Sequence, residues 1–264
     1  KSQNFTSATD AYNVAIGMLA GSEITTGTVN TLIGGLSGDA LTVGNSNVAV
    51  GYGSLTTDTK GDRNVAIGVS ALETQNFTTS TDAYNVAVGY TAGQSITTGS
   101  QNTMIGGLAG DATTTADNIT AVGYHSLSSN TTGTQNVAVG SLALDANTTA
   151  NNNTAVGHAS LGSNTTGASN VAVGTAALDA NTTASFNTAV GTSAGTAITT
   201  GNDTTLVGFE SGKALTTGNE NTGIGYRALL AATTGDENTA VGHSALAAVT
   251  TASDNTAVGS NAGG

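Results

Sequence analysis

The stretch NTAVGHASLGSNTTG at residues 153–167 contains the pattern that decides the fold. Its first five residues, Asn153 to Gly157, recur along the chain with Val or Thr at the second place and Val or Ile at the fourth. The glycine that closes this pentad occurs fifteen times, from Gly17 to Gly259, at intervals of seventeen residues. The interval lengthens once, to twenty-one, between Gly68 and Gly89. A fixed period of this size is typical of stacked-coil architectures.

The residue types within one repeat favour a short strand followed by turns. We number the repeat from its asparagine, so that Asn153 is position 1 and Gly157 is position 5. β-Branched residues at positions 2 and 4 lie on one face of a strand, because strand side chains alternate. Glycine at position 5 allows the backbone to turn where a side chain would not fit. Gly and paired Thr interrupt every window, so the apolar spacing of an amphipathic helix is never sustained.

The predicted fold is all-β: a parallel β-solenoid, of the β-roll or β-helix kind, with about fifteen coils of 17 residues. Strands stacked about 4.8 Å apart would make a rod of about 70 Å. We expect one continuous solenoid domain at residues 13–264, preceded by a lead-in segment at 1–12 whose sequence returns at 73–84. The four-residue insertion between residues 68 and 85 should form a small bulge carrying Phe77 and Tyr84.

Composition excludes several functional classes. Charged residues make up only 8% of the 264 residues, and Pro, Cys and Trp are absent, so neither a thick core nor a thiolate metal site is expected. The formal net charge is −12 with only five Lys and Arg, so no basic stripe is available for nucleic acid or anionic membranes. No apolar run approaches the length of a membrane span, which argues against membrane insertion.

Two columns of polar residues have a structural interpretation. Position 1 is Asn in thirteen of the fifteen coils, with Ile119 and Thr204 as exceptions, so stacking predicts a ladder of amides that bond the coils above and below. Acids at position 10 fall on every second coil, which keeps like charges apart, whereas a calcium site would gather them. These acids are Asp39, Glu73, Asp111, Asp145 and Asp179.

Position 3 leads to a prediction about partners. It lies on the opposite strand face from positions 2 and 4 and is Ala, Leu, Met or Gly, so both faces of the strand are largely apolar. We expect positions 2 and 4 to pack inside the coil and position 3 to face a partner. A homo-oligomer, with a trimer favoured, is the economical solution, because parallel rods suit cyclic symmetry. The last coil, ending at Gly264, carries no atypical cap, which predicts a segment of a longer fibre or a unit that stacks end to end.

No catalytic, cofactor-binding or metal-binding residues are predicted. His158 and His243 share position 6 but lie five coils apart, and His125 is at position 7 of another coil, so all three are interpreted as surface histidines. A Thr ladder at positions 13 and 14 is a candidate face for ice or carbohydrate, although adjacent residues of an extended segment point to opposite sides. Aromatic residues at position 6 could stack on sugars or simply pack at the corner; they are Tyr52, Tyr90, Tyr124, Phe209 and Tyr226.

Glycosylation is a further possibility in a secreted protein. Four Asn-Thr-Thr sequons would stack in register, and five further acceptor motifs occur along the chain. The stacked sequons begin at Asn130, Asn147, Asn164 and Asn181, and the others at Asn4, Asn76, Asn118, Asn152 and Asn202.

The repeat resembles those of phage and bacterial tail-fibre-like proteins, through the unit at 153–167. It is also similar to the head repeats of trimeric autotransporter adhesins, whose units carry a pentad like NVAIG at residues 64–68. Both resemblances imply a trimeric β-roll or β-helix that gives reach and attachment on a virion or cell surface. The chain is therefore expected to be a non-enzymatic, extracellular fibre segment, with a possible glycan or cell-surface receptor. The alternatives are a self-assembling extracellular filament and a ligand-binding solenoid that uses its Thr ladder.

Overall fold

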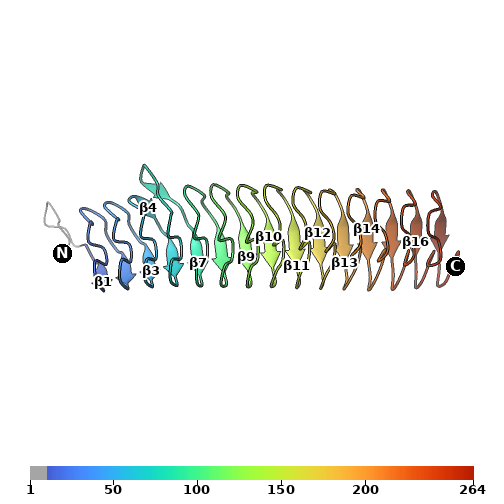
Figure 1. Ribbon diagram of the computed structural model, residues 1–264, viewed down its shortest axis with the longest axis horizontal. Helices are drawn as coiled ribbons and strands as arrows, with labels where there is room; N and C mark the ends of the chain where they lie inside the picture. The colour runs from blue at the N-terminus through green and yellow to red at the C-terminus, as the bar shows by residue number, and fades with distance from the viewer. Residues whose placement is uncertain (1–10) are drawn as a thin grey trace. The chain divides into compact units, whose positions relative to one another are not determined.

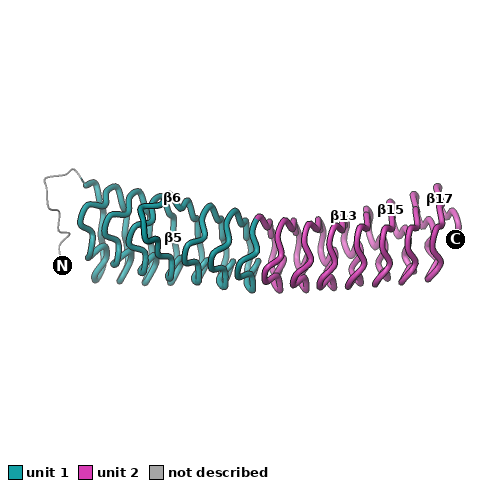
Figure 2. The backbone as a smooth tube through the Cα atoms, turned by 90° about the horizontal axis from the view of Figure 1, so that it is seen from above, with its two compact units in different colours: residues 1–134 teal, residues 135–264 magenta. Residues whose placement is uncertain are grey.

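Each coil of the chain contributes a strand of three residues to a parallel sheet, and turns make up most of the remainder (Figure 1). The computed structural model describes residues 11–264, and no helix occurs among them. The chain divides into two compact units, residues 1–134 and residues 135–264, which Figure 2 colours separately. The predicted all-β parallel solenoid with a period of about seventeen residues is confirmed within each unit. The predicted lead-in segment 1–12 lies outside the described residues apart from Ala11 and Tyr12.

The main sheet of unit 1 is built from seven strands, which pair in parallel in chain order. They are β1 (Val14–Ile16), β2 (Thr31–Ile33), β3 (Val48–Val50), β5 (Val65–Ile67), β7 (Val86–Val88), β8 (Thr103–Ile105) and β9 (Thr120–Val122). Partners are seventeen residues apart except between β5 and β7, where Val65 pairs with Val86. The longer interval makes room for a separate two-stranded parallel sheet of β4 (Gly61–Asp62) and β6 (Thr81–Asp82).

Unit 2 contains eight strands that pair in parallel without any change of interval. They are β10 (Val137–Val139), β11 (Thr154–Val156), β12 (Val171–Val173), β13 (Thr188–Val190), β14 (Thr205–Val207), β15 (Thr222–Ile224), β16 (Thr239–Val241) and β17 (Thr256–Val258). Each position of the repeat therefore forms a straight column of side chains across this unit.

The glycine at position 5 is required by both backbone conformation and space. Gly157 has a φ of +137°, a region that L side chains rarely adopt, and a Cβ there would lie 2.5 Å from the carbonyl oxygen of Gly174. Gly51 in unit 1 repeats the arrangement, with a φ of +138° and a distance of 2.4 Å to the oxygen of Gly68. The prediction that the chain turns here because no side chain fits is confirmed.

The side chain that points into the coil is the one at position 3, opposite to our expectation. Ala155 is fully buried, while its neighbours Thr154 and Val156 are partly exposed. The bulkier position-3 residues Leu32, Met104 and Leu206 are fully buried as well. The prediction that position 3 faces a partner is therefore wrong. The coil is too narrow to enclose two β-branched side chains per strand, and it encloses the single side chain at position 3 instead.

The interior of most coils is filled by one large side chain, from position 9 or position 12. Leu161 at position 9 accompanies Asn164 at position 12, whereas Gly195 at position 9 accompanies Ile198 at position 12. A Cβ on Gly195 would lie 2.9 Å from Leu206 Cδ1 and 3.1 Å from Ile198 Cδ1. Leu161 has a φ of +50°, which is rare for a bulky residue, so its packing must hold it there.

The predicted asparagine ladder at position 1 is confirmed. Asn153 accepts a hydrogen bond at Oδ1 from the backbone N–H of Asn170 at 2.9 Å, and Asn170 Nδ2 donates to the carbonyl of Ala184 at 2.8 Å. Both side chains are fully buried. Each amide therefore joins two coils and closes its own coil, which satisfies polar groups that would otherwise be buried without partners.

Candidate functional site

The outward side of each main sheet is formed by positions 2 and 4, and we call this surface the sheet face. In unit 2 its position-2 column consists of Val137, Thr154, Val171, Thr188, Thr205, Thr222, Thr239 and Thr256. Its position-4 column consists of Val139, Val156, Val173, Val190, Val207, Ile224, Val241 and Val258. Every member of these columns is at least partly exposed. The sheet face is thus a regular array of methyl and hydroxyl groups.

Charge is excluded from the sheet face and its borders. No Asp, Glu, Lys or Arg occupies positions 1–6 in any of the fifteen coils, although these residues form 8% of the chain. The charged residues from residue 11 onward lie at positions 7–17 or in the insertion. The sheet face therefore differs chemically from the rest of the surface in both units.

Aromatic residues at position 6 border the sheet face and pack against their neighbours. In unit 2 the rings of Phe209, Tyr226 and His243 stack on successive coils, with centroids 5.5 and 5.0 Å apart and interplanar angles of 14°. In unit 1 the ring of Tyr52 lies over Gly35 of the preceding coil, where a Cβ would come within 3.3 Å of it. Phe209 and Tyr226 therefore cover one another's faces, which favours the corner-packing interpretation for these two residues, whereas Tyr52, Tyr90 and Tyr124 of unit 1 remain exposed.

The two threonines of each Thr-Thr corner have different environments. The position-13 hydroxyls donate to the position-13 carbonyl of the next coil, as Thr165 does to Thr182 at 2.9 Å and Thr199 does to Thr216 at 3.3 Å. The position-14 side chains are exposed, and in unit 2 position 14 is Thr in seven successive coils. These are Thr149, Thr166, Thr183, Thr200, Thr217, Thr234 and Thr251. In unit 2 the position-13 side chains are mostly half-buried, so position 14 is the more exposed of the two columns.

The four stacked sequons are not accessible for glycan attachment. Asn130, Asn147, Asn164 and Asn181 are fully buried at position 12. Asn181 Nδ2 donates to Asn164 Oδ1 at 3.1 Å and to the carbonyl of Ala184 at 3.1 Å, so these amides form a second ladder inside the coil. The acceptor asparagines that lie on the surface are Asn76, Asn118 and Asn152, while Asn202 is half-buried and Asn4 lies outside the described residues.

Two of the position-10 acids accept hydrogen bonds from the side chain at position 10 of the next coil. Thr56 on the next coil donates to Asp39, and Gln94 on the next coil donates to Glu73. Burial raises the pKa of Asp179 above its ordinary value, and the charge of His158 opposes that shift. The alternation therefore gives two of these carboxylates a neutral donor on the neighbouring coil.

A second acidic column was missed by our reading of the sequence. Asp203, Glu220, Glu237 and Asp254 occupy position 17 of four successive coils and are all exposed. The seventeen-residue spacing of these acids was the signal that would have revealed the column. Nearby, Glu210 accepts hydrogen bonds from Lys213 and Arg227, which holds the pKa of its carboxyl below the ordinary value.

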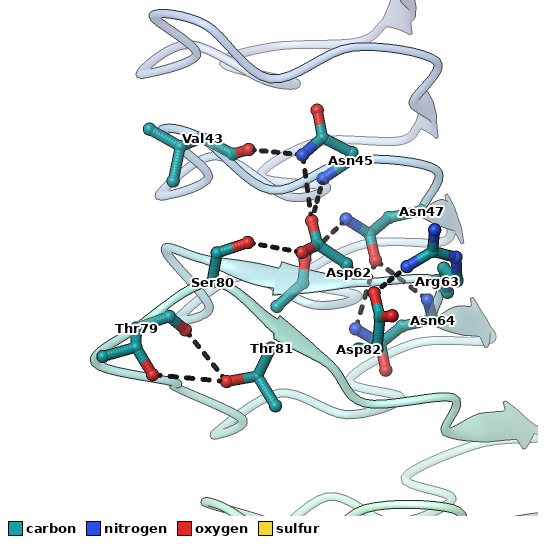
Figure 3. A network of polar contacts seen from close by, with 11 residues as sticks. Val43, Asn45, Asn47, Asp62, Arg63, Asn64, Thr79, Ser80, Thr81 and Asp82 are labelled. Atoms are coloured by element: carbon teal, nitrogen blue, oxygen red, sulfur yellow. Dashed lines mark hydrogen bonds and ion pairs between the residues drawn. The ribbon is translucent and has the colours of Figure 1, made fainter.

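The insertion is held by a polar network at β4 and β6, drawn in Figure 3. The carboxylate of Asp62 accepts from the backbone N–H of Asn45 at 2.6 Å, from Asn45 Nδ2 at 3.1 Å and from the Ser80 hydroxyl at 2.6 Å. Arg63 forms an ion pair with Asp82 beside it. Of the two aromatic residues expected on the bulge, Tyr84 is exposed and Phe77 is buried. The hydrogen bonds of Asp62 and the ion pair of Arg63 with Asp82 fix the insertion to its neighbouring coils.

Asp58 is a buried carboxylate beneath this network. Its Oδ2 accepts from Gln75 Nε2 at 2.6 Å, and its Oδ1 accepts from the N–H groups of Gly61 at 3.0 Å and Lys60 at 3.2 Å. Desolvation raises the pKa of Asp58, and these hydrogen bonds oppose the shift. Asp58 occupies position 12, the place that Asn164 fills in unit 2, so it belongs to the interior of the coil.

The histidines lie at separate places on the surface. His158 and His243 are exposed, and His125 is half-buried with its ring 4.4 Å from that of Tyr124. Across residues 11–264, no group of three or more His, Cys, Asp or Glu side chains is arranged to hold a metal ion. The same residues include no helix of sufficient length and hydrophobicity to span a membrane.

Comparison with protein-family models, with curated proteins and with solved structures gives no match for this chain.

Proposed function

We propose that the chain is a non-enzymatic structural segment of an extracellular fibre, of the tail-fibre or surface-adhesin kind, that gives reach and attachment. The observation that carries this proposal is the uniformity of the coils. The same ladder of backbone bonds, position-1 amides and corner glycines recurs through each unit. Such repetition is suited to holding distance, because each coil contacts only its neighbours and length is added coil by coil.

The insertion at β4 and β6 is the one described place in unit 1 where the register between successive main strands changes. Its carboxylates are bonded to neighbouring amide, hydroxyl and guanidinium groups. This arrangement supports a role in fixing the coil rather than in chemistry. The uniform coils and the hydrogen-bonded carboxylates of the insertion together favour a structural role.

Surface labelling tests this proposal. Antibodies raised against the purified chain, with gold-labelled secondary antibodies, should mark projections on intact virions or cells that carry the protein. The control is the same preparation incubated with antibody pre-absorbed on the chain. Labelling confined to the cell interior would contradict the proposed function.

The position-14 Thr column favours a second candidate function, a face that recognises a repetitive ligand such as ice or a glycan. Position 14 is Thr in seven successive coils of unit 2, whereas position 17, which is also on the surface, varies from Gln135 and Phe186 to Glu237. Position 14 therefore keeps one residue type where position 17, a second exposed column of the same coils, does not. This difference favours a role for the position-14 threonines.

Thermal hysteresis and glycan-array binding test this second candidate in separate arms. Replacing Thr183, Thr200 and Thr217 with alanine should abolish whichever activity the wild type has. Replacing the position-17 residues Ser169, Phe186 and Asp203 with alanine serves as the matched control. A wild-type chain with neither activity would remove the second candidate.

A further inference from the structure

We infer that the sheet face binds a second copy of this chain, so that identical solenoids associate side by side through positions 2 and 4. This inference rests on the proposed fibre function and specifies its partner. It also reverses the surface expected from the sequence, because position 3 lies inside the coil.

The exposed apolar side chains of the sheet face are the first observation. Ile224 is 41% exposed, and Val190 and Val207 are each 36% exposed, although they are β-branched residues in the middle of a sheet. In unit 1, Ile67 and Ile105 are 38% and 39% exposed at the same position. A column of exposed apolar side chains along one face is a feature that often marks a protein contact site.

The absence of charged residues makes the sheet face the surface through which two identical chains can approach with least repulsion. Unit 2 carries eight acids and two bases, which gives 2 − 8 = −6, so two copies repel one another over most of their surface. The sheet face and its borders at positions 1–6 carry no Asp, Glu, Lys or Arg. Two copies that approach through this face avoid placing like charges against each other.

The regular spacing of the sheet face favours a partner that has the same repeat distance. Strands about 4.8 Å apart repeat the same pair of side chains at every coil. A partner that remains in contact along such a face needs the same repeat distance, and a second copy of the chain has it by construction. Two such faces would pack about 10 Å apart, with their β-branched side chains interdigitating.

The area available on each unit suits a weak, reversible contact. Eight strands about 10 Å long at a spacing of about 4.8 Å give unit 2 a face of roughly 400 Å², and the seven strands of unit 1 give roughly 350 Å². The face of either unit is therefore about half of the roughly 800 Å² that each partner buries in a standard interface, which corresponds to the smaller, weaker class of contact.

Sedimentation of the full chain provides the test. The wild type should associate reversibly at micromolar concentration. The double variant Val190→Lys and Ile224→Lys places charge on the sheet face of two alternate coils, where both side chains already reach solvent. Its dissociation constant should rise at least about 100-fold, because burying unpaired lysines in an apolar contact is strongly unfavourable.

The matched control is Thr200→Lys and Thr234→Lys, which adds the same charge at exposed position 14 of the same two coils. Its dissociation constant should remain within about threefold of wild type, since position 14 lies outside the proposed contact. Circular dichroism melting checks that both variants remain folded.

Several outcomes would overturn the inference. A wild type that stays monomeric at about 100 times the concentration expected for association overturns it, as does equal weakening by the two double variants. A chain that is monomeric yet labels surface projections would remove the partner and leave the proposed function standing. A stable oligomer that labels no surface would do the reverse.

Discussion

The two sides of each coil are stabilised in different ways. On the sheet side, positions 1–6 are free of Asp, Glu, Lys and Arg, and the coils are joined by backbone bonds, as between Thr154 N–H and the Asn170 carbonyl at 2.8 Å, and by the buried amides of position 1. On the turn side, the coils are joined by partly exposed hydroxyls such as that of Thr165 as well as by backbone bonds, and the charged residues are found there. The sheet side therefore tolerates little change in backbone shape, whereas the turn side depends on which side chains fill it.

The largest expected effect comes from a pair of glycines two residues apart, one at each side. Gly51→Ala should lower the free energy of unfolding by about 3–6 kcal/mol, because it combines a strained backbone with overpacking against the next coil. A Cβ at Gly51 would lie 2.4 Å from the carbonyl oxygen of Gly68. Denaturant titration followed by circular dichroism measures the change.

Gly53→Ala is the control on the turn side. Gly53 has a φ of +63°, but the nearest atom to an added Cβ is the Ser70 hydroxyl at 3.8 Å. Only the left-handed backbone opposes the substitution, so the expected loss is about 1 kcal/mol. Equal losses for the two variants would show that inter-coil crowding is not what fixes the glycine at position 5.

The second prediction compares an interior residue with a surface residue of one coil. Leu161→Ala should lower the free energy of unfolding by about 2–4 kcal/mol, because it removes the large side chain that fills the interior of that coil and leaves a cavity. Val156→Ala on the sheet face should cost less than about 1 kcal/mol in the dissociated chain, since Val156 already reaches solvent. Thermal melting at a concentration below association measures both, and a larger loss for Val156 would contradict the orientation of the strand.

The repeat made the fold predictable but not the direction of its side chains. A seventeen-residue interval ending in glycine specifies a stack of coils, and Asn at position 1 specifies its amide ladder. Whether position 3 or positions 2 and 4 face inward depends on the width of the coil, which alternation alone does not encode. A usable signal did exist: bulky position-3 residues occur in coils with glycine at position 9, as Leu206 does with Gly212.

The candidate surface was harder to predict because it consists of what the sequence omits. The exclusion of charge from positions 1–6 becomes meaningful only when the structure places positions 2 and 4 outside. The buried sequon at Asn164 has the opposite character, since its motif suggested a surface site and stacking enclosed it. In both cases the stacking of neighbouring coils, rather than the local sequence, determines whether a side chain is exposed or buried.

The third prediction concerns position 12, where unit 1 has Asp58 and unit 2 has Asn164, and replaces each residue type with the other. The raised pKa of Asp58 means that the folded state binds the proton more tightly than the unfolded state. Stability from this group is therefore greatest at pH values below its ordinary pKa of 3.8 and is lost as pH rises through the raised value. Asp58→Asn should remove that loss, so the stability of the variant relative to wild type should rise from about pH 4 to neutral pH, on top of a pH-independent cost where its Nδ2 faces the Gln75 amide.

The reverse exchange, Asn164→Asp, should destabilise unit 2 by about 1–3 kcal/mol at neutral pH, because a carboxylate would face the Asn147 oxygen and the Gly167 carbonyl. Denaturant titrations between pH 4 and 8 measure both variants. A pH profile of Asp58→Asn parallel to wild type would mean that the buried carboxylate does not titrate differently on folding.

The smallest expected effect concerns acids of the turn side that differ in their partners. Glu220 and Glu237 lie on adjacent coils of the position-17 column, whose Cα atoms are about 4.8 Å apart. Replacing both with glutamine should raise the unfolding free energy by about 0.5 kcal/mol in low salt, because it relieves repulsion between like charges on neighbouring coils. The gain should disappear in about 1 M salt, where the screening length falls to about 3 Å.

Glu210→Gln is the opposing control, because Glu210 accepts from Lys213 at 2.6 Å and from Arg227 at 2.7 Å, so its neutralisation should lower stability. If both substitutions shift the denaturation midpoint in the same direction, net charge rather than the position of each acid governs this side of the coil.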